Sequence, residues 1–160
     1  MTFSPQLEDR FEKMLKRYPA GKTRSAVVPM LIYAQDETGA ITPELIAEVA
    51  KRCGVEPLQV DEVVGYYSML HRKPQGKHHV QVCTNISCLL VGGEELYEHA
   101  KKKLGIGHKE VTPDGQFSLE EVECMGACSW APAVEINYDF HHFVTPEQLD
   151  KLIDDLRKAQ

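Results

Sequence analysis

From Pro5 to about Leu70, apolar residues recur every three or four positions, with polar residues between them. This spacing predicts amphipathic helices that each bury one face. Four apolar stripes can be followed: Leu7, Phe11, Met14 and Leu15; Val27, Val28, Leu31 and Ile32; Leu45, Ile46, Val49 and Cys53; Val60, Val63, Val64 and Tyr67. We therefore expect residues 1–72 to form an N-terminal lobe of about four helices, and we expect Pro29 to kink the second one.

The third of these helices has the clearest boundaries. Thr42 is a typical N-cap, Pro43 suits the first helical position, and Gly54 is a typical residue to end the helix. Cys53 falls on the apolar stripe just before that glycine. A thiol in such a position behaves as a small core hydrophobe, so we predict that Cys53 is buried and binds no metal.

The pattern changes after Arg72–Gly76, a segment whose proline and glycine are typical of a linker. Alternation at Val80 and Val82 then predicts a strand that ends at Cys83. The elements expected after it are a helix containing Leu89, Leu96, Ala100 and Leu104, strands at 117–123 and 133–136, a hairpin at Asn137–Asp139, and a helix opened by a Thr145/Gln148 capping box. Residues 77–160 should therefore form a β-α-β-β-α layer with a right-handed first crossover, in the outline of a thioredoxin-like domain.

The overall class is thus α+β, with a helical bundle lobe followed by a thioredoxin-like domain. The 160 residues are 42% hydrophobic, enough to bury a core. The net charge is −6 and no long Lys/Arg run occurs, so nucleic acid is not an expected partner. No segment approaches the roughly 18 to 20 apolar residues that span a bilayer, and the N-terminus has no apolar leader, so we expect a cytoplasmic protein with no membrane span.

Two close cysteine pairs dominate the second lobe. Cys83 and Cys88 form a C-x4-C pair, and Cys124 and Cys128 form a C-x3-C pair. Reduced thiols are expected in the cytosol, so ligation of a soft metal explains these pairs better than disulfides do. Both spacings also occur in zinc sites, and spacing alone leaves zinc and an iron–sulfur cluster equally possible.

The residues inside the two loops favour the cluster. They are small or apolar and bring few charges, which suits buried inorganic sulfides that accept backbone N–H bonds. Gly126 allows the backbone to approach a bulky sulfide because it has no Cβ. The adjacent pairs His78-His79 and His141-His142 lie outside these loops, which argues against a Rieske centre.

Other chemistries find little support in the sequence. A Cys-x-x-Cys pair, which tunes the attacking thiol of a dithiol reductase, is missing. Gly105-Ile106-Gly107 follows a helix and lacks the third glycine of a dinucleotide fingerprint. Any oxidation of NADH would therefore need a partner that holds the flavin and the nicotinamide.

Several motifs carry a resemblance to a known family. The segments concerned are Val82–Cys88 (VCTNISC), Val122–Cys128 (VECMGAC), Ala131-Pro132, Thr112–Gly115 (TPDG) and Glu62–Met69 (EVVGYYSM). Together they resemble the thioredoxin-like 2Fe-2S ferredoxin subunit of respiratory complex I (NADH:quinone oxidoreductase), over nearly the whole chain. The visible departures are conservative: Met125 stands where Leu is common, and Tyr66 where Phe is common.

This resemblance implies one 2Fe-2S cluster on Cys83, Cys88, Cys124 and Cys128, and no catalytic residue in the chain itself. It also implies an electron-transfer subunit in the peripheral arm of the complex, bound to the flavin-bearing, NADH-oxidising subunit that holds FMN and NADH. The helical lobe is expected to contact that subunit through Tyr66 and Tyr67, and a homodimer or heterotetramer contact through this lobe is possible.

Three alternatives stay open at this stage. Similar subunits serve NAD-linked hydrogenases and formate dehydrogenases, and the sequence does not separate these assemblies. A zinc-stapled interaction module and a dithiol reductase are interpretations from other functional classes. The isomer of the Ala131-Pro132 peptide bond is also left open.

Overall fold

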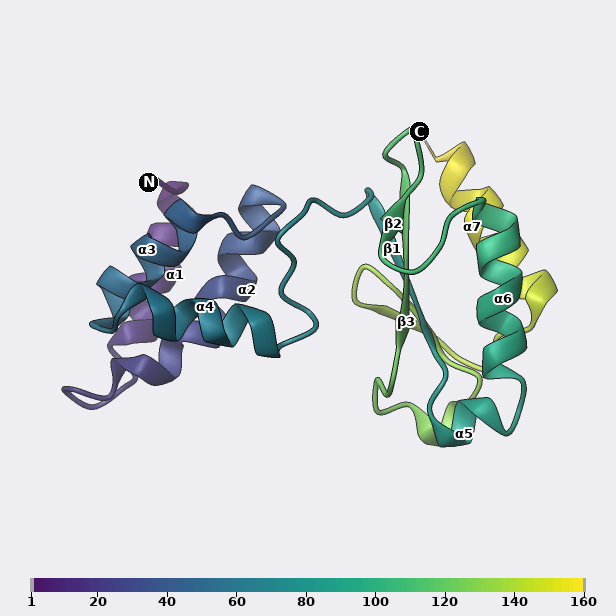
Figure 1. Ribbon diagram of the computed structural model, residues 1–160, viewed down its shortest axis with the longest axis horizontal. Helices are drawn as coiled ribbons and strands as arrows, with labels where there is room; N and C mark the ends of the chain where they lie inside the picture. The colour runs from purple at the N-terminus through teal and green to yellow at the C-terminus, as the bar shows by residue number, and fades with distance from the viewer. Residues whose placement is uncertain (1, 160) are drawn as a thin grey trace. The chain divides into compact units, whose positions relative to one another are not determined.

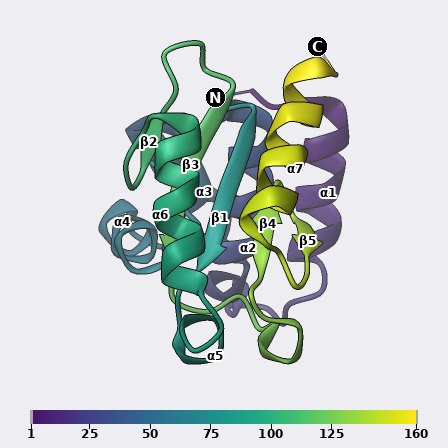
Figure 2. The same ribbon diagram turned by 90° about the vertical axis from the view of Figure 1, so that its right-hand side faces the viewer.

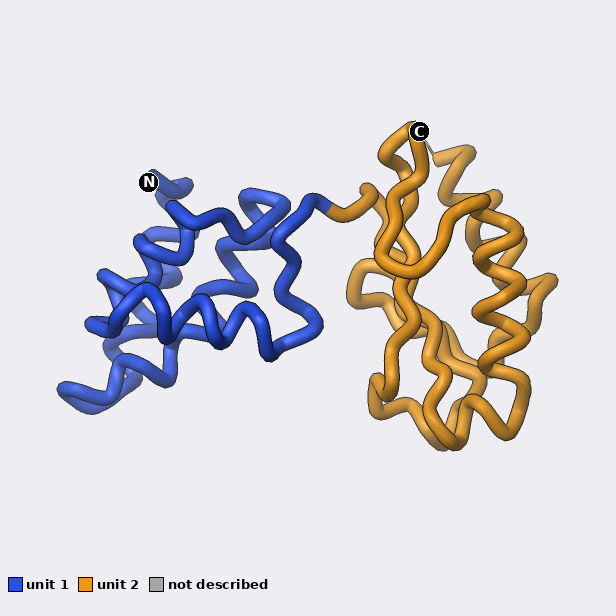
Figure 3. Tube along the Cα trace, in the orientation of Figure 1, with its two compact units in different colours: residues 1–74 blue, residues 75–160 orange. Residues whose placement is uncertain are grey.

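The computed structural model describes residues 2–159. The chain folds as two compact units, Met1–Pro74 and Gln75–Gln160, shown in blue and orange in Figure 3. The first unit is helical, and the second combines a sheet with helices (Figure 1). This is the α+β class expected from the change in hydrophobic period.

The first unit contains four α-helices and a short 3-10 turn. Their bounds are α1 Pro5–Leu15, η1 Thr23–Ala26, α2 Val27–Thr38, α3 Pro43–Cys53 and α4 Pro57–Tyr66. Three of the α-helices begin with proline directly after a capping residue, a position where the missing N–H costs nothing. The Thr42 hydroxyl accepts a hydrogen bond from the Leu45 N–H, and Gly54 ends α3 in a left-handed conformation, so both predicted boundaries are confirmed.

The apolar stripes of these helices meet in one core. It includes Phe11, Met30, Leu31, Leu45 and Val49, all with exposed fractions of 0%. The predicted kink in the second helix is wrong. Because α2 begins at Val27, Pro29 lies in its first turn, where no intrahelical N–H bond is lost.

The second unit is built on a five-stranded mixed sheet. The strands are β1 His78–Cys83, β2 Glu110–Val111, β3 Phe117–Val122, β4 Val134–Ile136 and β5 Asp139–His141, in the order β2-β3-β1-β4-β5. The central pair, β1 and β3, is parallel, with His78 opposite Phe117 and Cys83 opposite Val122. All other pairs are antiparallel.

Helices α6 (Gly93–Leu104) and α7 (Pro146–Lys158) cover one face of this sheet, side by side in Figure 2. Val80, Val82 and Leu119 point from the strands into the core beneath them. Leu96 and Leu149 meet these residues from the helices. The strand and helix periods therefore share one apolar layer.

The segment between β1 and β2 differs from the prediction. One helix carrying Leu89 and Leu104 was expected, but two form: α5 at Ile86–Leu89 and α6 at Gly93–Leu104. Gly92 separates them with a left-handed φ of 95°, a conformation that interrupts a helix. The two-residue edge strand β2 was not predicted either.

The expected hairpin is confirmed. Asn137 and Tyr138 connect β4 to β5, and both have positive φ, at 50° and 75°. Two such residues match the twist of the flanking strands. Nearby, the Ala131-Pro132 peptide bond is cis. Within residues 2–159, no helix has both the length and the apolar character needed to cross a membrane.

Gly93 provides a test of the packing around β1. A Cβ on Gly93 would lie 2.7 Å from the Cys83 carbonyl oxygen and 2.8 Å from the Cys88 carbonyl carbon. We predict that Gly93→Ala destabilises the protein by about 1–3 kcal/mol, because backbone must move to admit the methyl group. Urea unfolding followed by circular dichroism measures this change.

Gly65→Ala is the matched control. Gly65 lies in α4, and a Cβ added to it would have nothing within 4 Å. The same added methyl group should stabilise the helix by about 0.4–1 kcal/mol, because alanine has less freedom to lose on folding. Equal effects of the two changes would contradict the close approach at Gly93.

Candidate metal centre

The parallel pairing of β1 and β3 brings the two cysteine pairs together. Parallel strands end at the same edge of a sheet, and Cys83 is the last residue of β1, opposite Val122 at the end of β3. Cys124 follows only two residues later. The Thr84 N–H donates to the Val122 carbonyl at 3.1 Å, which continues the pairing into the loops.

Short helical turns place the other two cysteines. Cys88 lies in α5, whose first N–H, that of Ile86, donates to the Asn85 side-chain oxygen at 2.7 Å. Cys128 opens η2, the 3-10 turn Cys128–Trp130. These two turns contact each other. Both loops therefore bend back over the same edge of the sheet.

The four thiols surround one small cavity. Its walls are formed by Cys83, Asn85, Ser87, Cys88, Cys124, Ala127 and Cys128. The sulfurs of Cys124 and Cys128 are 3.9 Å apart. Two thiolates on one tetrahedral metal ion, with metal–sulfur bonds of about 2.3 Å, lie about 3.8 Å apart. This pair is therefore spaced for a shared metal ion rather than for a disulfide, and all the cysteines are free.

Burial differs across the site. Cys83 and Cys88 are buried, whereas Cys124 and Cys128 are exposed. Burial raises the pKa of the Cys88 thiol to about 11, and the neighbouring Cys83 and Cys128 thiols raise it further. A thiolate at Cys88 is therefore unfavourable without a nearby cation, and a coordinated metal ion supplies that positive charge.

Backbone groups also point at the sulfurs. The Gly126 N–H donates to the Cys124 sulfur at 3.4 Å, from a glycine whose φ of 80° most other residues avoid. The Cys83 thiol donates to the Glu123 carbonyl oxygen at 3.4 Å. A site with four thiols, N–H donation to sulfur and a largely neutral wall fits a thiolate-bound cluster.

The remaining candidates lie elsewhere. Cys53 is 2% exposed in the core of the first unit, where its thiol is 3.4 Å from the Met30 sulfur, as expected of a core residue. Burial raises the pKa of this thiol to about 11. Among the described residues, the cavity wall contains no histidine, and His142 instead packs its ring against Trp130.

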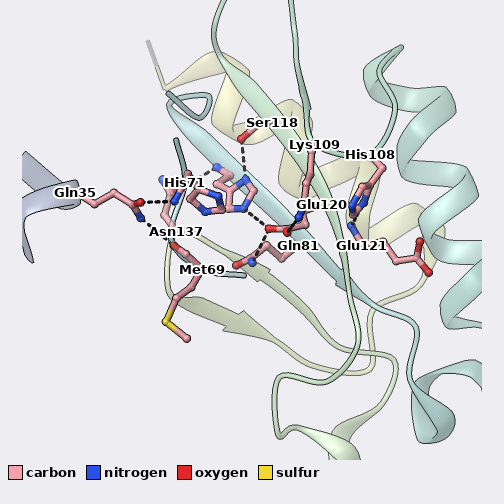
Figure 4. Close-up of polar contacts among 11 residues, drawn as sticks. Gln35, Met69, His71, Gln81, His108, Lys109, Ser118, Glu120, Glu121 and Asn137 are labelled. Atoms are coloured by element: carbon pink, nitrogen blue, oxygen red, sulfur yellow. Dashed lines mark hydrogen bonds and ion pairs between the residues drawn. The ribbon is translucent and has the colours of Figure 1, made fainter. Parts of the chain in front are cut away.

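A polar network occupies the sheet face opposite α6 and α7. His79 contacts the Ser118 hydroxyl at 2.8 Å through Nδ1 and the Glu120 carboxylate at 3.1 Å through Nε2 (Figure 4). Gln81 also donates to Glu120, at 3.3 Å. The strand register places these residues side by side, so they satisfy a buried carboxylate at some distance along the strands from the thiols.

Sequence reasoning missed the contributions of Asn85 and Glu123 at the edge of the cavity. Asn85 caps α5, and an asparagine before a short apolar run is a usable signal for a cap. Its contact with the Glu123 carboxylate joins residues far apart in sequence, and no local pattern reports such a contact.

Comparison with known proteins agrees with this site. The sequence pattern of the thioredoxin-like 2Fe-2S ferredoxin family matches residues 11–157. The chain therefore belongs to the thioredoxin-like 2Fe-2S ferredoxins. The cofactor of this family is a 2Fe-2S cluster, which confirms the predicted cofactor, and the four-thiol cavity fits it.

Two curated relatives, both NADH-quinone oxidoreductase subunits, match nearly the whole chain. Subunit 2 of the Thermus thermophilus oxidoreductase is 41% identical, over 100% of this chain and 89% of its own length. The corresponding protein of Rickettsia bellii is 43% identical, over 91% of this chain and 88% of its own length.

A solved structure also resembles the fold. An NAD+-reducing NiFe hydrogenase in the H2-reduced state aligns with a TM-score of 0.71 at 17% identity, over 84% of this chain and 22% of that chain. At this identity the likeness concerns the fold alone.

Serine substitutions test the assignment of ligands. We predict that Cys124→Ser abolishes or severely perturbs the cluster, because it removes one thiolate from the cavity, and that Cys53→Ser retains it. Iron and acid-labile sulfide per chain measure the outcome after anaerobic purification. Equal loss in the two variants would show that the ligand assignment is wrong.

Proposed function

We propose that this protein is the electron-transfer subunit of an NADH-quinone oxidoreductase, with one 2Fe-2S cluster on Cys83, Cys88, Cys124 and Cys128. The observation that carries the proposal is the meeting of these four thiols at one cavity. The full-length likeness to subunits of that oxidoreductase supports the assembly.

The bound cluster would supply one-electron chemistry, accepting and releasing a single electron. The chain's own contribution is to hold and shield it. Cys83 and Cys88 would bind from the buried side, and Ala127 helps to close the wall with an apolar group. The exposed Cys124 and Cys128 would form the side open to a redox partner.

The flavin and NADH belong to a partner subunit in this proposal. The sequence contains no dinucleotide fingerprint, so the chain would act as a carrier within a larger enzyme. The partner is proposed to be the flavin-bearing, NADH-oxidising subunit. The protein would then lie in the peripheral arm of the complex, on the cytoplasmic side.

An apolar rim next to the cavity supports docking of that partner. Ile86, Leu89, Leu90 and Trp130 are exposed around the cysteines, and Leu90 is 79% exposed. Exposed apolar clusters of this kind mark interaction sites. Close contact on this rim would also keep electron transfer over a short path from the exposed cysteines.

The helical unit offers a second apolar surface. Tyr66 is 83% exposed at the end of α4, and its ring meets that of Tyr67 edge to face at 5.3 Å. Aromatic side chains that remain exposed are typical anchors of protein interfaces. We propose that this surface contacts the same flavoprotein.

Anaerobic purification through a tag on this chain tests the function. The expected result is an FMN-containing subunit in the complex, with the cluster absorbance bleached by NADH in the complex but not in the isolated chain. Co-purification with a hydrogenase large subunit or a molybdenum formate dehydrogenase would assign the chain to another assembly. A colourless protein with stoichiometric zinc and no acid-labile sulfide would overturn the proposal.

Charge insertion tests the docking surfaces. We predict that Leu90→Glu and Tyr66→Glu each weaken capture of the flavoprotein about tenfold or more, because each buries a carboxylate at an apolar contact. Val111→Glu is the control, since Val111 is an exposed apolar residue on the edge strand β2. Iron content should stay at the unmodified level in all three. Capture unaffected by both test changes would contradict these surfaces.

A further inference from the structure

Two side-chain hydrogen bonds join the two cysteine loops. The Asn85 amide nitrogen donates to the Glu123 carboxylate at 2.9 Å. The Thr84 hydroxyl donates to the Glu121 carboxylate at 2.7 Å. Each bond connects the loop after β1 with the end of β3. The loops are therefore held together by side chains as well as by strand pairing.

Asn85 has a double role in this link. Its side-chain oxygen accepts from the Ile86 N–H at 2.7 Å and so begins α5, the turn that carries Cys88. Its amide nitrogen is bonded to Glu123 on the other loop. One planar group thus sets the start of one cysteine turn and the distance to the other loop.

Glu123 occupies the matching position on the second loop. It directly precedes Cys124, and its backbone carbonyl is 3.4 Å from the Cys83 sulfur. Its carboxylate is bonded to Asn85, a residue of the cavity wall. The hydrogen bond therefore keeps a negative charge beside the cavity instead of letting the side chain extend into solvent.

That charge has a predictable effect on a cluster in the cavity. A 2Fe-2S centre with four thiolates carries a charge of about −2 when oxidised and −3 when reduced. A carboxylate nearby disfavours the extra electron by Coulomb repulsion. Glu123 is exposed, so solvent screens this repulsion without removing it.

We propose that Asn85 and Glu123 form a positioning pair that joins the two ligand loops, and that the fixed Glu123 carboxylate lowers the reduction potential of the cluster. This inference rests on the proposed function, because it requires a cluster on the four cysteines. Asn85 and Glu123 act on the cluster through the loops and through charge, without binding iron.

Glu123→Gln separates charge from structure. Glutamine keeps an oxygen that accepts from Asn85 but has no charge. We expect full cluster content, an unchanged spectrum and a roughly threefold to tenfold rise in the equilibrium constant for one-electron reduction. This rise corresponds to a positive shift of about 30 to 60 mV, at 59 mV per tenfold for one electron. Spectroscopic redox titration of the purified protein measures it.

Asp155→Asn is the matched control, since it removes one exposed carboxylate from α7 near the C-terminus, at the opposite end of the second unit from α5 (Figure 2). This change should leave the potential within error of the unmodified protein. Equal shifts in the control and in Glu123→Gln would overturn the specific role of Glu123, as would no shift in Glu123→Gln.

Asn85→Asp tests the positioning role. Aspartate can still cap α5 but cannot donate to Glu123, and it places two carboxylates against each other. We expect faster loss of the cluster to an iron chelator, while Glu123→Gln loses it at the unmodified rate. Equal rates in Asn85→Asp and the unmodified protein would refute the joining role. An unmodified protein with no reducible cluster would instead refute the proposed function.

Discussion

The parallel pairing of β1 and β3 is the constraint on which the site depends. It is the one parallel pair in the described sheet, and it brings the ends of two strands, far apart in sequence, to one edge. Cys83 ends one strand, and Cys124 lies two residues beyond the other. A shift of this register by one residue would turn the apolar residues of β1 away from the helices and displace Cys83 from the cavity.

Helix packing holds this register in place. The apolar layer beneath α6 and α7 contains Val80 and Val82 of β1 and Leu119 of β3, so a shifted strand would bury polar groups. Gly93 allows the start of α6 to lie against the backbone of both Cys83 and Cys88. The thiols therefore belong to a packed framework, and the two exposed cysteines lie at its surface.

Much of this arrangement can be predicted from local sequence. Caps such as Thr42 and Thr145, each followed by proline, define helix starts because they satisfy groups within one turn. The cysteine pairs indicate a soft-metal site for a similar reason, since each pair is close in sequence. The edge strand β2 escaped prediction because two exposed residues carry no detectable alternation. The contact between Asn85 and Glu123 escaped because only the tertiary fold brings these residues together.

The central claim is that four converging thiols hold a redox-active 2Fe-2S cluster. Low-temperature EPR of the anaerobically purified chain, before and after dithionite, tests it most directly, because a reduced 2Fe-2S pair is paramagnetic and a zinc thiolate is silent. The account predicts no signal from the cluster before reduction and about one spin per chain after it, for a one-electron cluster. Silence in both states, with one zinc ion per chain, would contradict it.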